Sequence, residues 1–206
     1  MLINQVIEQA RSGELSNLTN KSYTDDKIIT YINLGLLELY KRFNLHSTEV
    51  IVTMVDNVTT YTVDGTDSNV TISTEADLLM LLEAYDEAGI QLPINKENDE
   101  YAVLTPTYNT VQVPYPVTGE RLSLIYSAGP TYIATGTQVL QLPVSLLEAL
   151  LHYIGYRSHG ARDGALQAEN NSHYQRFEAS CRRAISLGLV TEDEIPETDV
   201  QQKGFV

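Results

Sequence analysis

The sequence predicts an α+β protein, in which a helical bundle is made from both chain ends and an antiparallel β-rich subdomain is inserted between them. Near both ends, apolar residues recur at three- and four-residue steps, which is the helical period. The middle has β-branched and aromatic runs separated by turn residues, which is typical of strands. A length of 206 residues suits one domain with a large insertion. The expected segments are N-terminal helices in 1–45, the β-rich subdomain in 46–140, C-terminal helices in 141–189, and an extended tail that docks on a partner in 190–206.

Two helices are expected before residue 45. Residues 2–12 carry apolar side chains at helical spacing, and Gly13 follows as a stop signal. A second helix of about 20 residues begins after Thr24, a favourable N-cap. Asp25 and Asp26 fall in its first turn, where the helix dipole favours acids. Its broad apolar stripe predicts a helix that packs against a core.

The middle of the chain is expected to form hairpins. This prediction of hairpins rests on alternating β-branched residues that lie next to two-residue turn sequences. The expected pairs are Val50–Val55 with Val58–Val63, Leu78–Tyr85 with Ile90–Ile94, and Thr110–Val113 with Arg121–Ser127. A further strand, Asn69–Ile72, follows a turn at Asp64-Gly65. The loop 64–69 is interpreted as a turn, with a weak cation site as the alternative, because it lacks the residue order of an EF-hand.

The helical period returns after Pro143. One apolar, buried helix is expected through Tyr156, with a break in the glycine-rich run 155–164. A last helix is expected at about 165–187. One of its faces carries Tyr174, Phe177, Cys181, Ala184 and Ile185, and the arginines fall largely on the other face.

Charge is segregated along the chain. The net charge is −14, and residues 45–145 hold 13 acidic and two basic residues. Residues 150–189 are mildly basic, with five arginines against three acids. The acidic balance argues against a DNA-coating protein, because phosphate binding needs a surplus of Lys and Arg. The single cysteine excludes an intramolecular disulfide and a cysteine-based zinc site.

No catalytic motif is present, and we expect neither an enzyme nor a cofactor. His152 and His159 are seven residues apart and could share a helix face if the helix ran on. A structural role is favoured for both, because no Cys or carboxylate lies at metal-ligand spacing. His46 and His173 have no partner pattern. Cys181 lies on an apolar stripe, which favours a buried inert thiol over a nucleophile.

The best candidate contact residues are an arginine group and the tail. The candidates are Arg157, Arg162, Arg176, Arg182, Arg183, Ile195, Phe205 and Val206. The arginines either pair with surface charges and helix ends of their own chain, or meet an acidic surface on a neighbouring copy or partner. Acidic and basic patches on one chain suit head-to-tail contacts, which close into rings. The tail is either disordered or folds onto a partner through its apolar residues.

Three stretches carry a family resemblance: TDDKIITYINLGLLELYKRF, LIYSAGP and LQLPVSLLEALLHYIGYRSHG. Together with acidic hairpins and a final Tyr- and Arg-bearing helix, they resemble the head-to-tail adaptor proteins of tailed bacteriophages, nearest to the tail tubular protein A group, over residues 24–187. The resemblance implies a structural virion protein at the head–tail interface, assembled in the host cytoplasm. Such adaptors form a ring, usually twelve-fold, beneath the portal protein, extend the DNA channel without binding DNA specifically, and offer a platform for nozzle, tail proteins or fibres. It also implies that the helical bundle and the C-terminal segment meet the portal.

Two other functions stay open from the residues alone. One is a tail or fibre binding module that uses a tyrosine-rich β-region. Its tyrosines would be Tyr101, Tyr108, Tyr115, Tyr126 and Tyr132. The other is a small hydrolase with an unrecognised site around His152. No segment has the roughly 18 apolar residues of a membrane span, and the start lacks the pattern of a signal peptide, so we expect a soluble protein made inside the cell.

Overall fold

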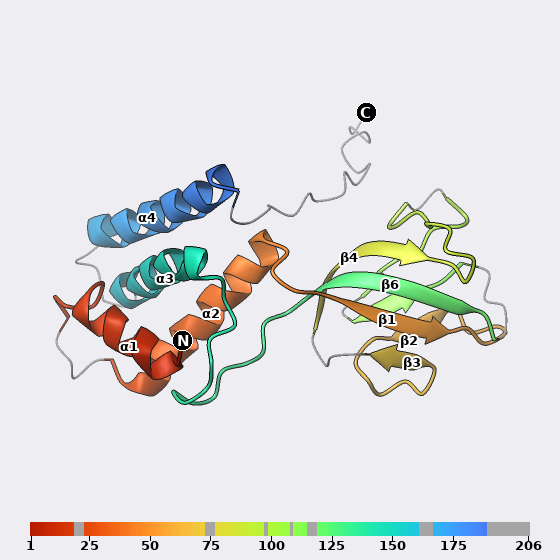
Figure 1. The fold of residues 1–206 in the computed structure, drawn as a ribbon, viewed down its shortest axis with the longest axis horizontal. Coiled ribbons are helices and arrows are strands. Elements are labelled where there is room, and N and C mark those ends of the chain that lie inside the picture. The colour runs from red at the N-terminus through yellow and green to blue at the C-terminus, as the bar shows by residue number, and fades with distance from the viewer. Residues whose placement is uncertain are drawn as a thin grey trace. The chain divides into compact units, whose positions relative to one another are not determined.

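The computed structural model describes residues 1–18, 23–72, 77–96, 99–107, 109–114, 119–160 and 167–188. The described residues divide into two compact units. One unit comprises those of Met1–Leu45 and Pro130–Glu192, and the other those of His46–Gly129. Helices in the first and antiparallel sheets in the second confirm the α+β class (Figure 1).

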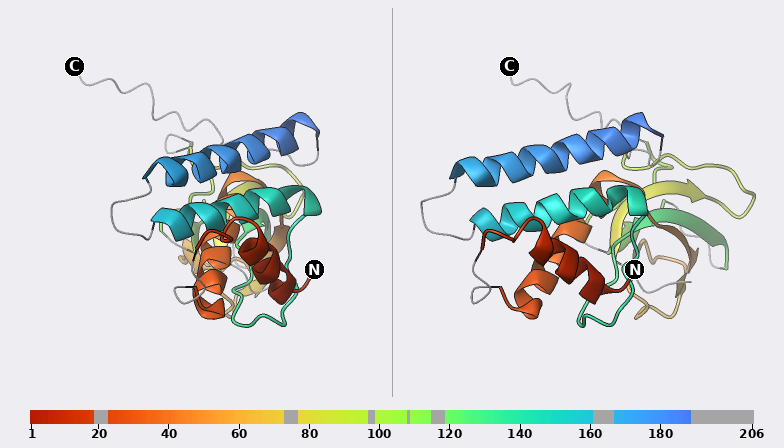
Figure 2. Two further views of the ribbon diagram at one scale, coloured as in Figure 1. Left: turned by 90° about the vertical axis from the view of Figure 1, so that its left-hand side faces the viewer. Right: turned by 60° about the vertical axis from the view of Figure 1, so that its left-hand side comes forward.

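Helices build the first unit. They are α1 (Ile3–Ser12), α2 (Asp25–Arg42), the 3₁₀ turn η2 (Val144–Leu146), α3 (Leu147–Gly160) and α4 (Gln167–Ser186). α3 and α4 lie side by side and antiparallel (Figures 1 and 2). Both ends of the chain therefore contribute to one helical core. Among the described residues, no helix is both long and apolar enough to cross a bilayer.

The N-terminal helices form where the sequence predicts them. α1 ends at Gly13, whose N–H donates to the Gln9 carbonyl at 3.0 Å. The Thr24 hydroxyl caps α2 by accepting a hydrogen bond from the Lys27 N–H at 3.4 Å. Such a cap satisfies one of the N–H groups that a helix start leaves without a partner. Both helices bury their apolar stripes completely or nearly so.

Residues 130–140 pack with the helices, whereas the sequence prediction extended the β-rich subdomain to residue 140. The Asn33 side chain of α2 binds the backbone of Ile133 twice, as donor and as acceptor, both at 2.9 Å. The Leu140 N–H donates to the Met1 carbonyl at 2.9 Å. Ile133 and Leu140 are buried there. These contacts join segments about 100 residues apart, which a local sequence pattern does not reveal.

The second unit holds two antiparallel sheets. The larger has the strand order β3-β1-β6-β4 and the smaller pairs β2 with β5. The strands are β1 (Ser47–Thr53), β2 (Thr60–Thr62), β3 (Val70–Ile72), β4 (Leu78–Tyr85), β5 (Thr110–Gln112) and β6 (Arg121–Ala128). β6 lies centrally, and its inward residues Leu122, Leu124 and Tyr126 are almost inaccessible to solvent. These side chains anchor the core of the unit.

The predicted strand positions are right except at Ile90–Ile94, where only isolated bridges form, and the first predicted pairing is wrong. β1 pairs with β3 and β6, not with the strand that follows it. β2 instead pairs with β5 in the smaller sheet. The turn at Asp56-Asn57 exists, with Asn57 at φ 61°, but the chain leaves the large sheet there. β6 instead pairs along both edges with β1 and β4, which places the inward side chains of all three strands in one core, so burial outweighs the local turn signal.

Of the other two expected hairpins, the one after β4 forms in part and the last does not form. The turn after β4 forms, because the Gly89 N–H donates to the Asp86 carbonyl at 3.0 Å. The segment after the turn returns along the end of β4, where the Asp86 N–H donates to the Ile90 carbonyl at 3.0 Å and the Leu92 N–H donates to the Ala84 carbonyl at 2.8 Å. The expected pairing is therefore present at its turn end, as a bridge between Tyr85 and Gln91, whereas the ladder partner of β4 is β6. β5 and β6 belong to different sheets, so the third expected pair does not exist.

Two further segments, the glycine-rich run 155–164 and the loop 64–69, were also interpreted from the sequence. α3 continues through Gly155 and ends at Gly160, inside the run 155–164 where the break was expected. Gly155 is buried. The loop 64–69 is a turn, as expected. Asp64 and Asp67 accept hydrogen bonds from the N–H groups of Thr66 and Asn69, both at 2.9 Å.

Candidate functional site: the α3–α4 face of the helical unit

Aromatic rings join α3 to α4. Tyr153 contacts Phe177 edge-on with ring centroids 5.4 Å apart, and Tyr156 lies 5.1 Å from Tyr174. Phe177 is 1 % exposed, whereas Tyr174 remains 42 % exposed. Edge-to-face pairs at this spacing add to the stabilisation from apolar burial. This aromatic seam, formed by Tyr153, Tyr156, Tyr174 and Phe177, therefore fixes α4 on α3 and leaves the Tyr174 ring at the surface.

Arg42 links α2 to the same seam. Its Nη2 lies 2.9 Å from Oε2 of Glu178, and its guanidinium stands over the Phe177 ring at 5.7 Å. Cys181 is 1 % exposed beside this pair, and burial raises the pKa of its thiol. The interpretation of Cys181 as a buried thiol is confirmed.

The predicted arginines of the two helices lie at the surface. Arg157 on α3 and Arg176, Arg182 and Arg183 on α4 are exposed. Arg176 and Arg183 are seven residues apart and so lie two turns apart on one side of α4. Among the described residues, these four arginines make no ion pair, in contrast to Arg11 and Arg42. Arg162, Ile195, Phe205 and Val206, and the tail 190–206, lie outside the described residues.

A second group of polar residues gathers between the end of α1, α3 and α4. Glu14 Oε1 lies 3.0 Å from His152 Nδ1, and Glu14 Oε2 lies 2.6 Å from His173 Nδ1. The side chains of the three residues are only 12–16 % exposed. His159 stacks on His173 with ring centroids 4.4 Å apart, and its Nε2 lies 3.2 Å from the Glu14 carbonyl oxygen. Burial lowers the pKa of His173, and the adjacent Glu14 carboxylate opposes this shift.

One face of α3 supplies half of this cluster. His152, Gly155 and His159 follow one another at three- and four-residue steps, which places them on one side of the helix. A Cβ at position 155 would lie 2.7 Å from His173 Nδ1 and 3.1 Å from Glu14 Oε2. Because Gly155 has no side chain, it leaves the space that the side chains of His173 and Glu14 occupy.

The sequence prediction missed most of this cluster. It considered that His152 and His159 could share a face, but it found no carboxylate near them. Glu14 is more than 130 positions away, and only the fold brings it to α3. The single local signal was the spacing 152–155–159, which becomes informative once the helix is extended through Gly155. His173 carried no signal at all.

The chain was also compared with known proteins. No match was found among curated proteins. The model of the SU10 adaptor protein family matches residues 2–197. The chain belongs to this family. The match runs through both units, so it covers the β-rich insertion as well as the helices. Membership makes the protein a structural bacteriophage adaptor, as the resemblance in its helices predicted.

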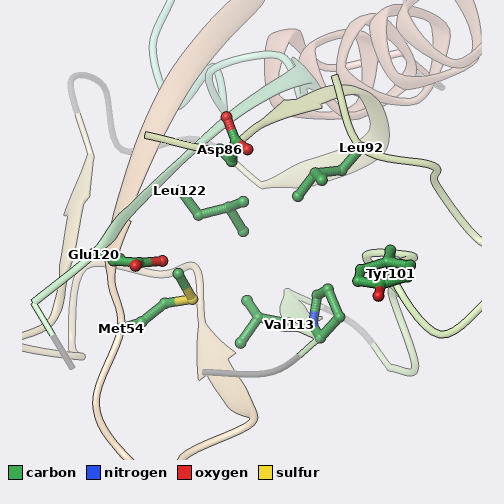
Figure 3. A pocket seen from close by; sticks show the side chains of 8 residues that line it. Met54, Asp86, Leu92, Tyr101, Val113, Glu120 and Leu122 are labelled. Carbon is green, nitrogen blue, oxygen red and sulfur yellow. The ribbon is translucent and has the colours of Figure 1, made fainter. Parts of the chain in front are cut away.

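In this SU10-family adaptor, the β-rich unit has a pocket of its own of about 370 Å³. Figure 3 shows the side chains of Met54, Leu92 and Leu122 around one space, with the Tyr101 ring at its side. The acidic residues Asp86 and Glu120 also line it. Such a lining suits an apolar side chain better than a sugar, which needs many hydrogen-bonding groups.

Of the three described tyrosines that the sequence offered for a β-region binding surface, only Tyr101 is exposed in the β-rich unit. Tyr126 is fully buried in the sheet core, and Tyr132 belongs to the helical unit. Tyr101 is exposed, and Tyr108 and Tyr115 lie outside the described residues. The expectation of a five-tyrosine surface is therefore wrong for Tyr126 and Tyr132, because one fills the core and the other leaves the unit.

Proposed function

We propose that this adaptor assembles with copies of itself into a ring beneath the portal protein, extends the DNA channel and carries the tail components. The observation that supports this most is the family match over residues 2–197, nearly the whole chain. On this proposal the protein is not an enzyme and needs no cofactor for its role. A twelve-fold ring of the tail tubular protein A type is the specific form that we propose.

Charge segregation supports ring formation. The acidic middle of the chain, with 13 acids and two bases in 45–145, offers each subunit a negative surface. The exposed Arg157, Arg176, Arg182 and Arg183 offer a positive one. A contact between two different surfaces of one protein is heterologous, and it closes into a ring when the rotation between subunits allows. Portal docking would use the same arginines or the tail that follows α4.

The acidic balance also suits a DNA channel. Like charges repel over roughly 8 Å at physiological salt, which is enough to keep sliding DNA off a channel wall. DNA would pass without specific binding, in line with the net charge of −14. On this proposal, nozzle or other tail proteins, and fibres in some virions, attach on the side away from the portal.

The tail contributes a third part of the proposal. Residues 190–206 carry five acids and one lysine, together with Ile195, Phe205 and Val206. A segment of this composition cannot build its own core, but it can fold onto a partner that offers apolar pockets. We therefore assign it to portal docking.

Reversing two arginines tests the docking surface. The variant Arg182→Glu/Arg183→Glu is expected to weaken assembly with portal at least about tenfold, because like charges then face each other across the contact. Co-sedimentation with purified portal at 0.1 M salt measures this. Both positions are exposed, so the fold should persist, and circular dichroism checks that it does.

The matched control is Lys27→Glu/Lys41→Glu, which changes the net charge equally on exposed positions of α2. This control should bind portal like the wild type. A chain ending at residue 189 tests the tail in the same assay and should bind more weakly. Wild-type binding by the double arginine variant would exclude Arg182 and Arg183 from the contact, and wild-type binding by the shortened chain would exclude the tail.

A further inference from the structure

We propose that Glu14, His152 and His173 bind one divalent transition-metal ion of the zinc class, which ties the segment after α1 to α3 and α4. The proposal concerns the folding of the subunit and does not depend on the ring. It rests on the converging donor atoms, on their missing hydrogen bonds and on the space that Gly155 leaves.

The donor atoms converge from three parts of the chain. One carboxylate oxygen and one ring nitrogen from each histidine lie within 4.8 Å of one another, and this is the one such group among the described residues. Ligands of a tetrahedral ion at about 2.0–2.2 Å from the metal lie roughly 3.3 Å apart. The observed separations, 3.0 Å from Glu14 Oε1 to His152 Nδ1 and 2.6 Å from Glu14 Oε2 to His173 Nδ1, are shorter than this, so side-chain rotations that move these groups apart by less than about 1 Å would admit the ion.

The same atoms lack ordinary hydrogen bonds. Glu14 Oε2, His152 Nδ1 and His173 Nδ1 are buried and none meets hydrogen-bond geometry, although Glu14 Oε2 and His173 Nδ1 are only 2.6 Å apart. Close atoms that do not align as donor and acceptor are expected when their lone pairs point to a shared third position. Buried polar atoms that face one another at 2.6–3.0 Å without an aligned hydrogen bond are costly, and a bound cation would satisfy all three.

The ligand chemistry selects the metal. Two imidazole nitrogens and one carboxylate oxygen suit Zn²⁺ and its neighbours, whereas Ca²⁺ and Mg²⁺ prefer oxygen ligands alone. A water can take the fourth position. A cleft of about 280 Å³, lined by Glu14, His173 and Arg176 among others, gives a path from solvent.

The surroundings fit a metal site as well. Glu148 lies 3.8 Å from the other ring nitrogen of His152, and a carboxylate behind a ligating histidine is a common arrangement that fixes the ring. His159 stacks on His173 and restricts its rotation. Gly155 leaves the room that a methyl group would occupy.

Calorimetric titration of the full, untagged and chelator-treated chain with ZnCl₂ tests the proposal. We expect one Zn²⁺ per chain with a Kd below about 1 μM. Glu14→Gln and His173→Gln should each weaken binding by at least about 100-fold, since even residues behind the ligands affect metal affinity 10–100-fold. His46→Gln is the matched control, because His46 is exposed in the other unit, and it should bind like the wild type.

A second readout does not depend on how well the variants fold. Co²⁺ bound to the wild type should give the absorption bands of a tetrahedral complex, and Zn²⁺ should displace it. Added Zn²⁺ should also raise the Tm of the wild type and of His46→Gln, because binding to the folded state alone stabilises it. A wild type that binds no stoichiometric Zn²⁺ would overturn the proposal. So would unchanged binding by both Glu14→Gln and His173→Gln.

Discussion

Gly35→Val is expected to lower the free energy of unfolding of the helical unit by about 2–3 kcal/mol, the range for forcing extra methyl groups into a packed core. Gly35 lies in α2 where it meets α3. A Cβ at this position would come within 2.6 Å of Leu150 Cδ1 and 3.0 Å of Tyr153 Cδ1. Glycine ordinarily costs a helix about 1 kcal/mol relative to alanine, so its presence here indicates close approach of two helices. Urea denaturation measured by far-ultraviolet circular dichroism gives the change.

Leu34→Val is the control for Gly35→Val. It also places a β-branched residue in α2, but at an exposed position, so it should change stability by less than about 0.5 kcal/mol. Gly35→Ala should fall between the two, because better helix propensity offsets part of the clash. If Gly35→Val proved as stable as Leu34→Val, the close packing of α2 on α3 would be wrong.

Phe177→Ala is expected to destabilise the helical unit by about 3–5 kcal/mol, the usual cost of removing a buried aromatic ring. Phe177 contacts Tyr153 and Tyr174 and lies under the Arg42 guanidinium. Its loss leaves a cavity in the seam that holds α4 on α3. Because α4 carries the proposed docking arginines, portal binding should fall together with stability. Thermal unfolding and portal co-sedimentation of the same samples test both effects.

Tyr174→Ala serves as the control for Phe177→Ala. Tyr174 belongs to the same seam but is 42 % exposed, so its removal should cost about 1 kcal/mol or less in stability. An equal loss of stability in both variants would mean that the seam does not depend on burial at Phe177.

Local patterns predicted the helices well. The Thr24 cap, the Gly13 stop and the apolar stripe of α4 each depend on neighbours within a few residues, and the structure has all three elements. The break expected in the run 155–164 corresponds to the end of α3 at Gly160, but the sequence did not reveal that Gly155 lies inside the helix and leaves room for another part of the chain.

Strand pairing was predicted less well for a physical reason. β1 and β6 pair over seven residues, although about 70 positions separate them. A turn sequence such as Asp56-Asn57 favours its own hairpin, but β6 pairs with β1 and β4, and the inward side chains of this sheet share one core with Tyr61 and Val111 of the smaller sheet. The free energy of that burial decides the topology, and no local pattern contains it.

The two candidate sites also differ in how well the sequence predicted them: the arginines were predicted and the Glu14–His152–His173 group was not. The arginines were found because composition and helical spacing reveal an exposed basic face, and Arg157, Arg176, Arg182 and Arg183 are exposed. The Glu14–His152–His173 group was not found, since its members come from separate segments and meet only in the folded unit.

The central claim is that this SU10-family adaptor forms a ring on the portal. Electron microscopy of the purified wild-type chain mixed with its portal protein tests this most directly. Class averages should show a second ring stacked coaxially on the portal, with an open channel through both and twelve repeated subunits. Portal particles without added density, with the adaptor remaining monomeric in the same mixture, would contradict the account.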